Sequence, residues 1–301
     1  MKCLAALAAA AAASAWAADD CSALVEAARA AYAGKQYQSA AGKLEQALGS
    51  CPLGVSLLLD LAKTRFMAQE FEKASEALGR LLTAEPRHAA ALKLQGDTLY
   101  LLGKNQEAEQ SLVAASQLDP ANPDANYALG RIYYQQSRYD ESIEQLRKVL
   151  TLDPKSYRAY DNIGLAYEGL NDVPKAIANF QRAMELSAGV DPPYDWVYGN
   201  MSNLMHKEGD YKKAFQFGAE AAHRNPNSAR NFFLTGRALG KLERWELAAK
   251  WLGQSVELDP QYAEARYQYS LALRKLGRTS EADAQLSAFR EISAGQPRNR
   301  R

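Results

Sequence analysis

The sequence has little net charge, few cysteines and no apolar run long enough to cross a membrane. Its 36 basic and 35 acidic residues leave a formal charge of +1, so no overall field attracts the chain to nucleic acid or to an acidic membrane. The longest apolar stretch, residues 4–18, is mostly alanine and is shorter than the roughly 20 residues that span a bilayer. We therefore expect a folded chain, 47% hydrophobic, with no transmembrane helix and no nucleic-acid partner.

Residues 1–18 are arranged as a secretory signal peptide. Lys2 gives a positive start, an apolar middle follows, and Ala15, Trp16 and Ala17 form a small-residue cleavage site. A buried alanine-rich helix is the alternative, but this run has no polar face. We expect the mature chain to be exported, to the periplasm or outside the cell, and to carry no lipid anchor.

Of the three cysteines, Cys3 leaves with the leader, and Cys21 and Cys51 remain as an even pair. An exported chain meets conditions that permit disulfides. Two thiols thirty residues apart, with no histidine pair nearby, do not make a zinc site of four ligands. A bridge between the two cysteines and a pair of free thiols both remain open.

The chain repeats itself with a period of 34 residues. A shift of 34 aligns residues 103–108 with 137–142 and 171–176, and the Asp–Pro pair at 119–120 with the pair at 153–154. A four-residue insertion, Asp191 to Tyr194, interrupts the register once. The repeats begin at Cys21, Val55, Ala89, Pro123, Tyr157, Asp195, Ala229 and Ala263.

Small and large residues recur at fixed positions of each repeat. Position 20 is alanine or serine throughout, position 24 is mostly leucine, and position 32 is mostly proline, which ends a helix. Small residues at positions 8 and 20 are what a tight pair of helices requires, because a larger side chain would push the backbones apart. The residues at position 8 are Ala28, Ala62, Gly96, Gly130, Gly164, Ser202, Gly236 and Ser270.

This pattern resembles the tetratricopeptide repeat (TPR) family, whose 34-residue unit reads W-x2-L-G-x2-Y, then A-x3-F, then P. Leu129 and Gly130 with Tyr133 match it, as do Ile163 and Gly164 with Tyr167. The resemblance implies an all-α fold, a right-handed α-solenoid of about eight TPR helix-turn-helix repeats. Repeats 1–5 would span residues 21–190 and repeats 6–8 residues 195–296, with the insertion at 191–194 and a tail at 297–301.

The resemblance also implies where the cysteine pair, the insertion and the last helix lie. Positions 1 and 31 lie at the same end of one hairpin, so Cys21 and Cys51 should come close. The insertion is either a plain surface loop or a lip beside Trp196. In the last helix, residues 280–292, the apolar side chains have no following repeat to cover them, so we expect self-association or a partner there.

No pattern of catalytic residues is visible. His88, His206 and His223 stand in no metal-ligand or catalytic-triad spacing, and the nucleophile-elbow, zincin and phosphate-loop motifs are missing from the sequence. We expect no enzyme activity, no catalytic residue, no metal and no cofactor. An enzyme would need chemistry around His206.

In the family, positions 2, 5, 9, 12 and 13 usually face a concave groove. At these positions eleven side chains are basic and five acidic, which favours an acidic segment or a carboxylate terminus. The basic residues are Arg29, Lys63, Lys93, Arg131, Arg158, Lys207, Arg230, Arg237, Lys241, Arg274 and Lys275. Aromatic residues accompany them, although those at position 12 are also common in the repeat framework. The residues we expect to bind a partner are Tyr127, Arg131, Tyr134, Arg158, Phe233, Arg237 and Lys241.

The sequence thus predicts a non-enzymatic scaffold that holds an extended segment of another protein or peptide. The alternative is a structural accessory subunit of an envelope assembly, of the secretion or pilus type, bound through its convex face or its C-terminal end. Reversing the charge at Arg131 and Arg237 separates the two hypotheses, since only the first requires the groove.

The cysteine pair gives a first testable prediction. If Cys21 and Cys51 are bridged, closing a loop of about 30 residues contributes roughly 3–4 kcal/mol on the chain-entropy model. The intact mass of the unreduced mature protein should be two hydrogens lower than the mass of the reduced one. Two free thiols in the unreduced protein would contradict the bridge.

Overall fold

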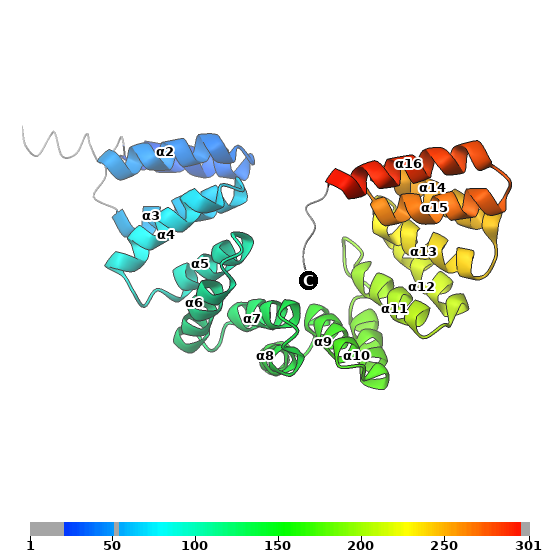
Figure 1. Cartoon of the computed structure of the whole chain (residues 1–301). Helices are drawn as coiled ribbons and strands as arrows, with labels where there is room; N and C mark the ends of the chain where they lie inside the picture. Colours follow the sequence, from blue (N-terminus) through cyan, green and yellow to red (C-terminus); the bar gives the residue numbers. More distant parts are fainter. Residues whose placement is uncertain (1–20, 51–53, 296–301) are drawn as a thin grey trace, which may run out of the picture. The chain divides into compact units, whose positions relative to one another are not determined.

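The computed structural model describes residues 21–50 and 54–295, which form helices joined by short turns and contain no strand (Figure 1). The predicted all-α solenoid is confirmed. The signal peptide at 1–18, Cys51 and the tail at 297–301 lie outside the described residues, so export and the disulfide stay predictions. No described helix is long and apolar enough to cross a membrane.

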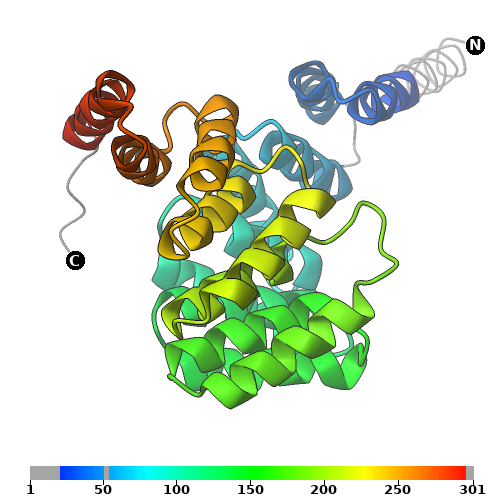
Figure 2. The same ribbon diagram turned by 90° about the vertical axis from the view of Figure 1, so that its right-hand side faces the viewer.

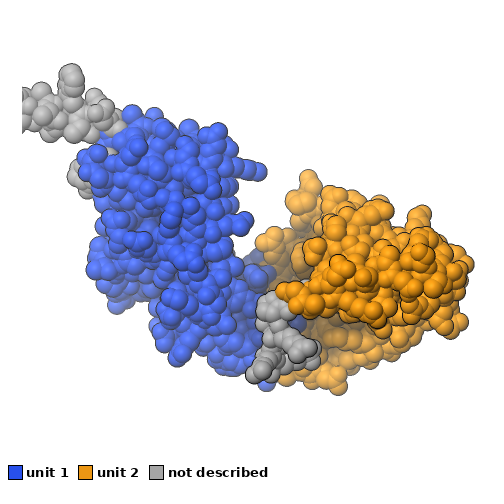
Figure 3. Space-filling model, turned by 45° about the horizontal axis from the view of Figure 1, so that its top comes forward, with its two compact units in different colours: residues 1–154 blue, residues 155–301 orange. Residues whose placement is uncertain are grey.

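The chain divides into two compact units, which we call unit 1, up to Pro154, and unit 2, from Lys155 onward (Figure 3). Unit 1 begins with the helical residues 21–33 and continues with α2 (Tyr37–Ser50), α3 (Gly54–Met67), α4 (Phe71–Ala84), α5 (Ala89–Leu101), α6 (Asn105–Leu118), α7 (Asp124–Gln135) and α8 (Tyr139–Leu152). Unit 2 contains α9 (Tyr157–Gly169), α10 (Val173–Leu186), α11 (Trp196–Lys207), α12 (Tyr211–Arg224), α13 (Ala229–Lys241), α14 (Trp245–Leu258), α15 (Ala263–Lys275) and α16 (Thr279–Gly295).

Within each unit the helices pack in chain order. Each helix contacts the one before and the one after it, and first helices of successive hairpins also touch: α3 with α5, α5 with α7, α9 with α11, α11 with α13, and α13 with α15. Figure 2 shows α11 to α16 following one another, from yellow-green to red. A hairpin therefore covers its apolar side with its sequence neighbours, as in other solenoids.

The turn inside each hairpin contains one residue with a left-handed backbone. Their spacing is 34 residues, except for 38 where the insertion intervenes, between Asn171 and Gly209. Only three of them are glycines, so five side chains accept a conformation that glycine adopts at lower cost. The described residues with positive φ are Lys35, Gln69, Gly103, Ser137, Asn171, Gly209, Glu243 and Gly277.

The close packing predicted for positions 8 and 20 is present. A Cβ atom built on Gly130 would lie 2.6 Å from Cγ of Leu146, and one on Gly96 would lie 2.5 Å from Cγ of Leu112. The eight residues at position 20 are all fully buried: Ala40, Ala74, Ala108, Ser142, Ala176, Ala214, Ala248 and Ala282. The two helices of a hairpin therefore approach as closely as their backbones and these small residues allow.

This packing predicts opposite effects for two glycine substitutions. Gly130→Ala forces a Cβ against Leu146, and overpacking of about 1–3 kcal/mol should exceed the helix-propensity gain of about 0.5–1 kcal/mol. Gly79 is an exposed residue of α4 where a Cβ would meet nothing within 4 Å, so Gly79→Ala should show only the stabilisation from the higher helix propensity. Urea unfolding followed by circular dichroism measures both. Equal stabilisation by the two substitutions would mean that the hairpin is not tightly packed.

Candidate partner-binding site

The seven residues predicted to bind a partner lie on three first helices of the two units. Tyr127, Arg131 and Tyr134 are on α7 of unit 1, Arg158 is on α9, and the remaining three are on α13 of unit 2. The structure brings Phe233, Arg237 and Lys241 together, because they are four residues apart on one helix.

The aromatic residues at position 12 pack inside their own hairpins. The Tyr134 ring lies 5.8 Å from that of Tyr139, the first residue of α8. The same contact joins Tyr32 to Tyr37 and His206 to Tyr211, at 5.4 and 5.3 Å. These rings close the hairpin framework, the alternative that the sequence left open for Tyr134. Tyr127 is half-buried and Arg131 is exposed.

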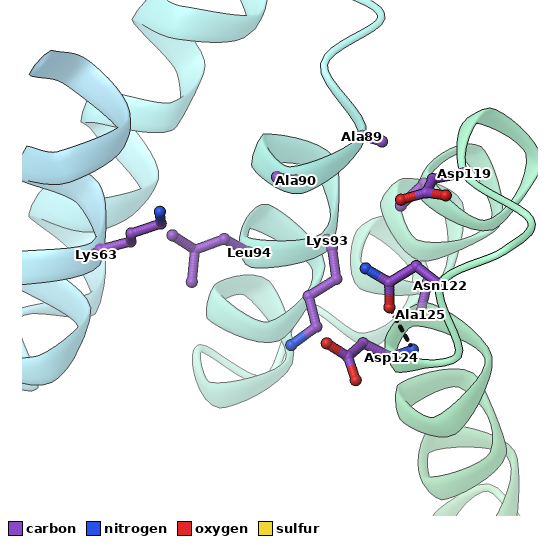
Figure 4. A pocket seen from close by; sticks show the side chains of 10 residues that line it. Lys63, Ala89, Ala90, Lys93, Leu94, Asp119, Asn122, Asp124 and Ala125 are labelled. Atoms are coloured by element: carbon purple, nitrogen blue, oxygen red, sulfur yellow. Dashed lines mark hydrogen bonds between the residues drawn. The ribbon is translucent and has the colours of Figure 1, made fainter. Parts of the chain in front are cut away.

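A hollow of about 250 Å³ in unit 1 contains charges of both signs. Lys63 and Lys93 line it together with Asp119 and Asp124, and Figure 4 shows the charged ends of Lys93 and Asp124 turned toward each other. Lys93 also pairs with Asp97 at 2.6 Å. Of the two basic groups of this hollow, Lys93 is thus already compensated by a carboxylate.

Arg237 of α13 is a half-buried cation without a carboxylate partner among the described residues. Its Nη2 donates to Oδ1 of Asn203 at 2.9 Å, and its guanidinium lies 5.3 Å from the centre of the Phe233 ring. Its Nε is buried without a hydrogen-bond partner. Burial lowers the pKa of Arg237, and the neighbouring cation Arg230 acts in the same direction. A negative group would be favoured beside this charge.

Lys241 and Arg237 form one edge of a second hollow, of about 220 Å³, among α13, α14 and α15. We call it the basic hollow. Four of its lining residues are basic and none is acidic, in contrast to the hollow of unit 1. Its lining residues are Arg237, Gly240, Lys241, Trp245, Leu252, Gln268, Leu271, Ala272, Arg274 and Lys275.

Arg230, one helical turn or more before this hollow, is fixed by residues of α11. Its Nη2 donates to Oδ1 of Asn200 at 2.9 Å, and its guanidinium lies 5.2 Å from the ring of Trp196, which is 56% exposed. Gly199 leaves room for it, since a Cβ there would collide with Nη1 of Arg230. Burial lowers the pKa of Arg230, against the attraction of Tyr262, Asp161 and other groups.

A buried carboxylate fixes the insertion to α9. Asp161, 2% exposed, accepts hydrogen bonds from Oη of Tyr194 at 2.6 Å and from Nδ2 of Asn200 at 2.9 Å. The Tyr194 ring also packs 4.8 Å from that of Tyr157. Burial raises the pKa of Asp161 although both hydrogen bonds and Arg230 oppose it. The insertion therefore has a positioning role. Tyr194 holds the carboxylate of Asp161, this carboxylate holds the amide of Asn200, and the oxygen of that amide accepts a hydrogen bond from Arg230.

His206 stands next to the same cations. Its Nδ1 is buried without a hydrogen-bond partner. Burial, with Arg237 and Lys241 acting in the same direction, lowers the pKa of His206 to about 4, so the ring is neutral near pH 7. The described residues contain no group of three histidine, cysteine, aspartate or glutamate side chains that could hold a metal ion.

Models of one repeat family match the chain. A model described as TPR repeat matches residues 96–137 and 130–171, and two described as tetratricopeptide repeat match residues 157–189 and 233–297. Together they span more than half of the chain. The chain belongs to the tetratricopeptide repeat family. TPR proteins are generally scaffolds that bind proteins or peptides, and the fold supports a protein-interaction scaffold role for this chain.

Solved TPR structures resemble the chain over different lengths. The crystal structure of the MamA protein is 26% identical, with a TM-score of 0.53, over 57% of this chain and 93% of that one. A TPR protein from Parabacteroides merdae is 17% identical with a TM-score of 0.70, over 85% and 99%, and Pseudomonas aeruginosa PilF is 23% identical with a TM-score of 0.58, over 70% and 94%. The last two likenesses show the fold alone. No curated protein sequence matches the chain.

The buried carboxylate predicts a pH-dependent stability difference. Because the pKa of Asp161 is raised in the folded protein, its contribution to stability is complete below the unfolded pKa and is lost as pH rises through the folded pKa. In Asp161→Asn the side chain does not titrate, so the variant does not lose stability in this way as the pH rises. The unfolding free energy of the variant relative to the wild type should therefore increase between about pH 4 and pH 7.

Urea unfolding at the two pH values measures this difference. Asp191→Asn, which changes an exposed carboxylate at the start of the insertion, is the control. A difference for Asp161→Asn that does not change with pH would show that the Asp161 carboxyl titrates alike in the folded and unfolded chain.

Proposed function

We propose that the TPR scaffold holds an extended acidic segment of another protein against the first helices of unit 2, α11, α13 and α15. The observation that carries this proposal is the basic hollow, where Arg237, Lys241, Arg274 and Lys275 gather without an acidic lining residue. Of these four, only Arg274 forms an ion pair with a residue in the part of the chain that the structure describes, namely with Asp283 at 2.7 Å.

The energetics favour a ligand of opposite charge. Arg237 has lost part of its hydration, and one neutral amide oxygen replaces it. A ligand carboxylate can bind a guanidinium with two parallel hydrogen bonds, and such charge-assisted bonds are stronger than the bond to Asn203. Binding would thus recover a cost that the free protein already bears.

Tyr127 and Arg131 on α7 are the proposed contacts of unit 1, and Arg158 on α9 is a proposed contact of unit 2. Both arginines are exposed and form no ion pair with another described residue. Because their side chains remain solvated, we expect them to steer an acidic partner more than to determine its affinity. The signal peptide predicted at residues 1–18 would place this action outside the cytoplasm.

The second candidate is an accessory subunit of an envelope assembly, bound through the C-terminal end. The last helix, α16, favours it, because Ala282 is its only buried residue in the described part of the chain and Leu286, Phe289 and Ile292 are only half-buried. Phe289 packs on Tyr267 at 5.4 Å, which covers one side of that ring. This candidate does not require the basic hollow.

Selection of peptides on the protein tests the proposal. A phage-displayed library of twelve-residue peptides, selected on the immobilised mature chain at low salt, should become enriched in aspartate and glutamate. Lys241→Glu with Lys275→Glu should then weaken binding of the selected peptides at least tenfold, because two attractive charges become repulsive.

The matched control is Lys212→Glu with Lys250→Glu, which makes the same charge change on exposed positions of α12 and α14. It should leave the affinity within about twofold. Neutral or basic peptides in the selection, or an equal loss in both double variants, would refute binding at the first helices of unit 2.

A further inference from the structure

The basic hollow has an apolar interior inside its charged edge. Trp245, Leu252 and Ala272 form much of the wall, and Leu271 stands among the four cations while remaining 39% exposed. The exposed part of Leu271 leaves apolar surface in contact with water, and covering that surface with a ligand side chain is favourable. The hollow of unit 1 differs, since aspartates take part in its lining.

Its size fits one side chain. The hollow measures about 220 Å³, below the roughly 300–1,000 Å³ of pockets that enclose small-molecule ligands. A large aliphatic or aromatic side chain can enter it and cover Leu271, and the chain on either side would then pass the cationic edge.

The cations at this edge are not equivalent. Arg274 is already paired with Asp283, and Lys275 lies 5.7 Å from the ring of Trp245. Arg237, Lys241 and Lys275 have no carboxylate partner among the described residues and are available to a ligand. They carry three positive charges on two helices, α13 and α15, and one carboxylate compensates one charge, so an acidic group on each side of the apolar residue suits them better.

We propose that the basic hollow binds one large apolar side chain of a peptide segment whose neighbouring residues are acidic. This proposal rests on the proposed function and adds the sequence type of the segment: an aliphatic or aromatic residue flanked on both sides by aspartate or glutamate. The apolar residue fills the hollow and covers Leu271, and the flanking carboxylates approach Arg237, Lys241 and Lys275.

Three labelled nine-residue peptides test the two parts separately. The first has one leucine between four glutamates, the second has serine in place of the leucine, and the third keeps the leucine but has glutamines in place of the glutamates. Fluorescence anisotropy should show the wild type binding the first peptide at least tenfold more tightly than either of the others, because only the first supplies both interactions.

Two leucine variants locate the apolar contact. Leu271→Ser, in the hollow, should weaken binding of the first peptide about tenfold and leave binding of the serine peptide unchanged. Leu247→Ser changes a leucine of similar exposure, 44%, on α14 outside the hollow, and should leave both affinities unchanged. Circular dichroism checks that both variants keep the wild-type helicity.

His206 reports where the carboxylates bind. Because Arg237 and Lys241 help to lower its pKa, a ligand carboxylate placed beside them should raise that pKa, measured by NMR titration and assigned with His206→Gln. An unchanged His206 pKa at saturation would overturn the placement.

The outcomes distinguish the two proposals. Equal affinity for the leucine and serine peptides, or equal loss in the two leucine variants, would overturn the apolar subsite and leave the acidic-segment function standing. Equal affinity for the glutamate and glutamine peptides, or no binding of any peptide, would overturn the proposed function as well.

Discussion

The close approach of the two helices in each hairpin is the constraint on which the structure depends. Gly130 against Leu146 and Gly164 against Phe180 leave no space for a Cβ atom, and the buried small residue at position 20 completes the contact from the other helix. Because each hairpin is tightly packed in itself, its outer faces are free to meet a neighbour or a ligand. Stability then arises from local contacts repeated along the chain, and the exposed face of the first helices can vary in charge without affecting the core.

Most of this framework could be predicted from the sequence, because it follows from a period. Small residues, leucines and prolines at constant positions indicate where helices begin, touch and end. The turns cannot be predicted from residue type alone. Glu243 and Gln69 adopt the same left-handed backbone as Gly103 and Gly277, and only their position in the repeat indicates this conformation. The surrounding hairpin overrides the local preference, since the two tightly packed helices determine where the chain has to reverse.

The candidate site was only partly predictable. Phe233, Arg237 and Lys241 stand out because a helical spacing of four places them on one face, and that can be read from a single segment. Trp245 and Leu271 complete the basic hollow from α14 and α15. Leu271 stands at a usual groove position of its repeat, but Trp245 does not, so the apolar interior of the hollow was missed. Proximity between residues of different hairpins depends on how the hairpins stack, which the period does not specify.

The insertion affects both the repeat framework and the candidate site. It interrupts the 34-residue period, and the sequence alone is compatible with either a plain surface loop or a lip beside Trp196. Its Tyr194 instead donates to Asp161, and Asp161 fixes Asn200, whose amide oxygen holds the guanidinium of Arg230. A buried, desolvated carboxylate is a costly way to attach a loop, and an apolar contact would stabilise the hairpins more simply. What the carboxylate adds is direction: it fixes the amide of Asn200 so that its oxygen faces Arg230, and it places a negative charge behind that cation. The cations of α13 therefore differ in their readiness for a ligand, since Arg230 is held by this buried chain of hydrogen bonds, whereas Arg237 and Lys241 remain available at the edge of the hollow.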